Sequence, residues 1–170
     1  MRMGIVGSGL MGSKLGTILA RAGHDVVFSY SRSQTKLKRL AREAGANARA
    51  GVPAEAIADA DAILLAVHWS RLDDVLSQAG SLARRTVVTC SLPMTKNDSR
   101  MVLGLTTSGA QTLSARLRQA HVVSAFSTAA SEVLFSVFDK RKRKSRPVLR
   151  RSQGSEEDRS EADPRCRLQS

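Results

Sequence analysis

Short runs of β-branched and apolar residues alternate along the chain with longer segments in which apolar residues recur at helical spacing. The predicted strands cover residues 3–6, 26–30, 46–50, 63–67, 86–90 and 122–126. The predicted helices cover residues 10–22, 33–44, 53–60, 71–79, 109–120 and 129–138. The run at 63–67 is apolar throughout, which is typical of a strand buried on both faces. This order predicts an α/β fold with a doubly wound parallel sheet of the Rossmann type.

A glycine pattern follows the first predicted strand directly. Gly7, Gly9 and Gly12 form G-x-G-x-x-G where the strand turns into the first helix. Gly7 permits a tight turn, Gly9 lets the backbone approach a pyrophosphate, and Gly12 allows the helix to pack closely on the strand. The helix N-terminus then favours an anion. The alternative is a turn that needs only flexibility.

The residues after the second predicted strand select between two dinucleotides. An Asp or Glu at this place binds the adenosine ribose of NAD, whereas an Arg accommodates the additional phosphate of NADP. This chain has no carboxylate there but Ser31, Arg32 and Ser33, with Lys36 one helical turn later. These side chains suit a phosphate dianion, so we expect NADP and not NAD. The alternative is a solvated basic start of a helix.

The fourth predicted strand leads into Val67, His68 and Trp69, at the edge of the sheet where ligands of open α/β folds bind. Trp69 either borders the cofactor or is an anchor of the core or of an interface. His68 is a candidate acid or base, but it has no carboxylate near it in sequence, which favours a structural or solvent-facing role. Asp73 and Asp74 have the pattern of a solvated helix start. The sequence therefore names no catalytic residue.

Charge divides the chain into two parts. The 170 residues include 27 Lys and Arg against 15 Asp and Glu, and 11 of the 27 basic residues fall in residues 140–170. We expect residues 1–139 to form the NADP-binding domain and residues 140–170 to be a basic, disordered tail, because few apolar residues are left there to bury. An alternative is a tail that binds nucleic acid through charge, but aromatic residues for base stacking are few, at 4%.

Several other classes of protein are disfavoured. No apolar stretch reaches the roughly 18 residues of a membrane span, and the glycines near the N-terminus interrupt any signal-peptide core. Cys90 and Cys166 give neither a disulfide framework nor metal-ligand spacing. We therefore expect no metal, no membrane partner and a cytoplasmic location.

Residues 1–139 resemble the NADP-dependent deazaflavin (coenzyme F-420) reductase family, through GIVGSGLMGSKLGTILARAGHDVVFSYSRS, AILLAVHW and HVVSAFST. The resemblance implies hydride transfer between NADP and a deazaflavin or related acceptor, and a homodimer. The chain departs from the family at three places. Pro is common where His68 stands, Asn is common where Ser127 stands, and Leu92-Pro93 replaces a common Asn-Pro pair. The cofactor residues that motif and resemblance together indicate are Gly7, Ser8, Gly9, Leu10, Met11, Gly12, Ser31, Arg32, Ser33, Lys36, Val67, His68 and Trp69.

Members of this family continue past the length of this chain, which suggests a hypothesis for the tail. Back-translation of residues 149–169 with suitable synonymous codons, read one base later, gives CGDRKAAKKTARKLIRDVGF, which resembles the family's continuation. We therefore expect a frame shift near residue 148, and the nucleotide sequence would decide it. The leading function is an NADP-dependent oxidoreductase, and the alternatives are an NADP-binding module without turnover and a nucleic-acid-binding protein driven by the tail.

Overall fold

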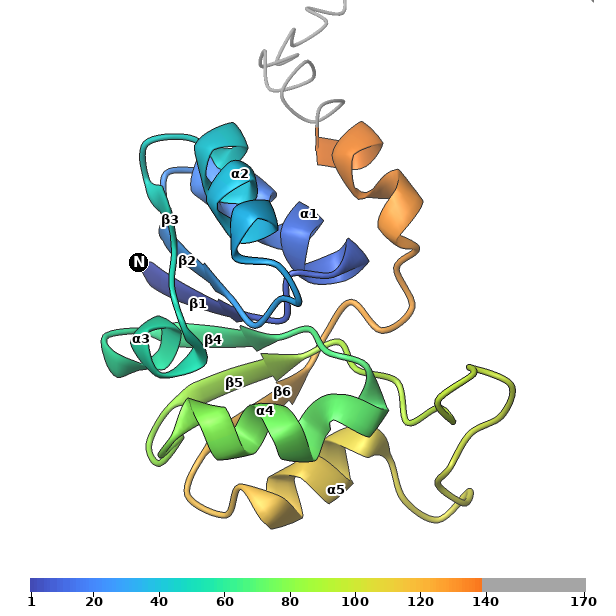
Figure 1. Ribbon diagram of the computed structural model, residues 1–170. Coiled ribbons are helices and arrows are strands. Elements are labelled where there is room, and N and C mark those ends of the chain that lie inside the picture. Colours follow the sequence, from blue (N-terminus) through green and yellow to red (C-terminus); the bar gives the residue numbers. More distant parts are fainter. Residues whose placement is uncertain (139–170) are drawn as a thin grey trace, which may run out of the picture.

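The computed structural model describes residues 1–138, so the predicted tail and its frame shift lie outside the described residues. Six parallel strands form one sheet in the order β3-β2-β1-β4-β5-β6 (Figure 1). This is the strand order of the Rossmann fold, which confirms the predicted fold class. The strands are β1 (Arg2–Val6), β2 (Asp25–Ser29), β3 (Ala48–Ala50), β4 (Ala62–Leu65), β5 (Thr86–Thr89) and β6 (His121–Ser124).

Helices cover both faces of the sheet (Figure 1). One face is covered by α1 (Leu10–Arg21) and α2 (Gln34–Ala44), and the other by α3 (Pro53–Ala58), α4 (Leu72–Ala79) and α5 (Gly109–Arg116). Because successive strand residues point to opposite faces, neighbours in β4 serve different cores. Leu64 belongs to the α1–α2 core, whereas Ile63 and Leu65 belong to the other. The apolar run predicted to be buried on both faces is therefore buried on both.

Several boundaries differ from those predicted. The strand predicted at 26–30 ends at Ser29 because Tyr30 has a left-handed backbone, with φ of 54°, and Phe126 (φ 62°) lies beyond the end of β6 in the same way. A short 3-10 turn, η1 (Trp69–Arg71), precedes α4. The helix predicted at 109–120 ends at Arg116. The helix predicted at 129–138 begins as the 3-10 turn η2 (Ser131–Val133) and is α-helical over residues 134–138.

The last described segment returns to α1. Lys14 Nζ donates a hydrogen bond to the carbonyl oxygen of Ser131, at 2.8 Å. The Arg21 guanidinium lies over the Phe135 ring, 5.6 Å from its centroid, in a cation–π contact. Val133 and Val137 are exposed. Within residues 1–138, no helix is long and apolar enough to cross a membrane.

Candidate functional site

The glycine turn joins β1 to α1 through two tight backbone contacts. Gly7 has φ of 106°, a left-handed conformation that glycine adopts without strain. A Cβ on Gly12 would lie 1.8 Å from the carbonyl oxygen of Gly7, so only glycine fits between the turn and the helix. A Cβ on Gly9 would meet no atom within 4 Å. Gly7 and Gly12 therefore shape the turn, while Gly9 leaves open space beside it.

Ser8 fixes the turn to the neighbouring strand. Its amide donates to the carbonyl oxygen of Tyr30, at 3.3 Å, and its buried hydroxyl donates to that of Ser29, at 3.0 Å. Both donors of Ser8 are thus used within the protein. No side chain caps α1, and no acidic residue stands in its first turn. A helix N-terminus of this kind favours an anionic ligand.

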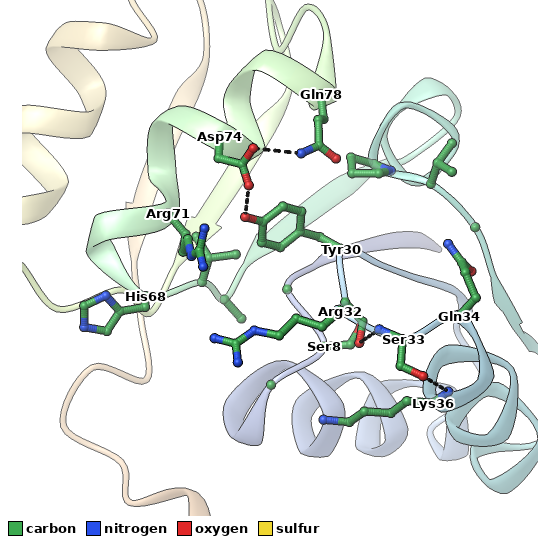
Figure 2. A pocket seen from close by; sticks show the side chains of 18 residues that line it. Ser8, Tyr30, Arg32, Ser33, Gln34, Lys36, His68, Arg71, Asp74 and Gln78 are labelled. Atoms are coloured by element: carbon green, nitrogen blue, oxygen red, sulfur yellow. Dashed lines mark hydrogen bonds between the residues drawn. The ribbon is translucent and has the colours of Figure 1, made fainter. Parts of the chain in front are cut away.

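A cavity of about 660 Å³ lies against the glycine turn, at the carboxyl ends of β1, β2, β3 and β4 (Figure 2). Ligands of open α/β sheets bind at this edge. The cavity brings together nine of the residues that the sequence indicates. They are Gly7, Ser8, Gly9, Ser31, Arg32, Ser33, Lys36, Val67 and His68.

Four of the indicated residues do not line the cavity. Gly12 packs against the turn, and Leu10 is exposed at the start of α1. Met11 packs against the α1–α2 core. Trp69 packs against the opposite core and lies close to Gly109, where an added Cβ would be 3.2 Å from its ring. Of the two roles weighed for Trp69, this packing favours that of an anchor between η1 and α5.

The segment after β2 presents two cations to the cavity. The Ser33 hydroxyl accepts from the amide of Lys36, at 3.2 Å, and so caps α2. Arg32 and Lys36 line the cavity and are exposed, and neither forms an ion pair with any residue in the described part of the chain. Arg32 and Lys36, near the N-terminus of α1 that no side chain caps, therefore suit the phosphate groups of a ligand.

The structure adds a group of residues that the sequence reasoning missed. Tyr30 comes from the end of β2, whereas Asp74 and Gln78 come from α4 (Figure 2). The Tyr30 hydroxyl donates to Asp74, and Gln78 Nε2 donates to the same carboxylate, at 3.1 Å. Asp73 and Asp74 are exposed in the first turn of α4, as the sequence predicted, and in addition Asp74 lines the cavity while Asp73 pairs with Arg116.

His68 has a carboxylate partner that is distant in sequence. Its Nε2 lies 2.9 Å from Asp98 Oδ1, and its Nδ1 lies 2.8 Å from the Ser70 hydroxyl. Its ring points away from Arg32 and Tyr30 (Figure 2). Next to it, the Ser91 hydroxyl donates to the carbonyl oxygen of Val67, at 2.6 Å, which fixes the chain after β4. No sequence signal connects His68 with Asp98, because the two residues are thirty positions apart and meet only in the folded chain.

The strand order and the cavity at the carboxyl ends of the strands define a protein of the Rossmann class. The sequence profile described as NADP oxidoreductase, coenzyme F420-dependent, matches residues 2–93, more than half of the chain. The chain belongs to this family, which confirms the resemblance, and NADP-dependent oxidoreductase is the description of the family. No curated protein gives a significant sequence match.

Solved structures share the fold. A protein from Arthrobacter sp. FB24, assigned as an F420-dependent NADP reductase, is 19% identical, with a TM-score of 0.69 over 78% of this chain. The protein SMa0349 of Sinorhizobium meliloti is 27% identical, with a TM-score of 0.68 over 79%. A reductive aminase from Aspergillus terreus, solved with NADPH, is 19% identical, with a TM-score of 0.53 over 72% of this chain and 39% of its own. The chain spans 65% of each of the first two structures, less than two thirds of their length.

Proposed function

We propose that this chain binds NADP(H) in the cavity, with the pyrophosphate at the turn containing Gly9 and the adenosine phosphate at Ser31, Arg32 and Lys36. The observation that carries the proposal is that Arg32 and Lys36, which form no ion pair within residues 1–138, line the cavity that also contacts the glycine turn before α1. The cavity lining holds three basic side chains against one carboxylate, that of Asp74. This charge balance fits a polyanionic ligand.

The proposed reaction is hydride transfer between NADP and a deazaflavin or a related acceptor. The family supports it. When bound, the nicotinamide supplies the hydride chemistry, and the residues of the chain hold and orient it. Val67 and His68 line the cavity after β4 and are proposed to hold the nicotinamide half. No side chain is assigned a catalytic role in this reaction.

Titration with NADPH and NADH tests the cofactor proposal. We expect a preference for NADPH of about tenfold or more, equivalent to about 1.4 kcal/mol. In Arg32→Asp this preference is lost, because the cation at the phosphate is replaced by an anion. Lys38→Asp makes the same change of charge on α2, outside the cavity, and is expected to keep the preference. Failure of the unmodified chain to bind either nucleotide would overturn the proposal.

Turnover is measured separately, as oxidation of NADPH by an oxidised deazaflavin. Activity supports the oxidoreductase, whereas tight binding of NADPH without activity toward any acceptor supports the NADP-binding module. The homodimer and the cytoplasmic location expected from the sequence stay predictions.

Cys90, the one cysteine within the described part of the chain, is a free and partly buried thiol, and burial raises its pKa above the usual value.

A further inference from the structure

A side-chain bridge crosses the cavity between β2 and α4. The Tyr30 hydroxyl donates to Asp74 Oδ2, while Gln78 Nε2 donates to Asp74 Oδ1, at 3.1 Å (Figure 2). Tyr30 adopts its left-handed backbone with a bulky aromatic side chain, which is uncommon and costs conformational energy. The residue with this uncommon backbone conformation lines the cavity.

The protonation states of the bridge are defined by its own contacts. Burial and the bond to Asp74 raise the pKa of the Tyr30 phenol, so it stays a neutral donor at pH 7. The Tyr30 bond is the largest cause that lowers the pKa of Asp74, so Asp74 is an ionised acceptor. Each carboxylate oxygen has two acceptor positions, and each receives one hydrogen bond from the bridge. Asp74 therefore retains acceptor capacity toward the cavity.

The surroundings of the bridge suit a flat, apolar ring that carries a donor. Val52 and Pro53, after β3, line the same cavity as the Tyr30 ring. Arg32, the proposed partner of the adenosine phosphate, follows Tyr30 by two residues. The base belongs to the same nucleoside as that phosphate, and Tyr30, Asp74 and Gln78 line the same cavity as Arg32.

We propose that the Tyr30–Asp74–Gln78 bridge recognises the purine base of the dinucleotide, with Asp74 accepting a hydrogen bond from the exocyclic amino group of adenine. This rests on the proposed binding of NADP(H) and adds a base specificity to it. A carboxylate attracts the amino group of adenine and repels the carbonyl oxygen that replaces it in hypoxanthine. Tyr30 and Gln78 act as positioning residues, because they hold the carboxylate.

The experiment compares NADPH with nicotinamide hypoxanthine dinucleotide phosphate in its reduced form, by fluorescence titration of the full chain. We expect NADPH to bind about fivefold or more tightly, the scale of one charge-assisted hydrogen bond at a solvated site. In Asp74→Asn the discrimination falls to about twofold or less, since an amide both donates and accepts. Tyr30→Phe, which frees the carboxylate to rotate, lowers the discrimination in the same direction.

Asp73→Asn is the matched control, because Asp73 stands next to Asp74 on α4 but pairs with Arg116 and does not line the cavity. It is expected to keep the preference for adenine. Equal affinity of the unmodified chain for the two nucleotides overturns the inference and leaves the proposed function standing. Discrimination that survives in Asp74→Asn also overturns it. Absence of binding to both nucleotides by the folded chain instead overturns the proposed function itself.

Discussion

His68 and Asp98 are hydrogen-bonded through Nε2 and Oδ1, at 2.9 Å, although thirty residues separate them. The pair connects the segment after β4 to the loop in which Met94 and Met101 form an isolated antiparallel β-bridge of the backbone. His68 is partly buried and Asp98 is largely exposed. Exposed ion pairs contribute little to global stability, at most about 1 kcal/mol. The effect of this pair is therefore expected to be local.

Asp98→Asn and His68→Gln are predicted to loosen that loop without unfolding the domain. Amide hydrogen exchange should become faster over residues 94–101, while the amides of β4 and β5 keep their protection, because the strands are held by their own ladder. Mass spectrometry of exchanged peptides measures this. Unchanged exchange in the loop of both variants would show that the pair does not hold it.

Gly12→Ala is predicted to destabilise the domain by about 1–3 kcal/mol, the usual range for overpacking. The added Cβ would meet the Gly7 backbone, which cannot move without distorting the turn. Gly9→Ala is the matched comparison, since its Cβ meets no protein atom within 4 Å. We expect Gly9→Ala to fold with nearly unchanged stability in urea unfolding but to bind NADPH more weakly. Equal loss of stability in both variants would contradict this division of roles.

Ser33→Ala is predicted to cost about 1 kcal/mol of stability, the typical value for the loss of an N-cap. The Ser33 hydroxyl accepts from the Lys36 amide, so its removal leaves a helical N–H without that partner. Ser114→Ala is the control, an exposed position inside α5 that caps no helix. Thermal unfolding compares the two, and a melting temperature lowered equally by both substitutions would argue against the cap.

Asp61 is predicted to make the fold sensitive to acid. Its carboxylate accepts from the Arg2 amide at 2.8 Å, and this bond holds its pKa below the usual value. Because the folded-state pKa is the lower one, its contribution is complete above the unfolded-state pKa and is lost as pH falls through the folded-state pKa. Unfolding in urea from pH 7 to pH 3 should therefore show a shallower loss of stability in Asp61→Asn. Asp59→Asn, which removes a neighbouring carboxylate, is expected to follow the unmodified chain.

Local rules acting on near neighbours predicted the strand and helix order, the glycine turn and the cations after β2. The boundaries were less accurate, as at Tyr30 and Phe126, because a pattern of apolar residues does not show where a backbone turns left-handed. Trp69 shows that local patterns do not predict packing either. The strand that leads to Trp69 correctly indicated that it lies at the carboxyl edge of the sheet. Its packing near Gly109, however, depends on where α5 docks.

The sequence alone determined the class of fold, the glycine turn and the cations of the candidate site, because these are made from contiguous residues whose periodicity and backbone freedom can be recognised in the chain. The tertiary structure decided the partners of His68, Tyr30 and Asp73, which are Asp98, Asp74 and Arg116. These pairs span 30 to 44 residues. Each forms only once parallel strands have paired and helices have packed on them, since hydrogen bonds require atoms within about 3 Å, a distance that sequence separation does not specify.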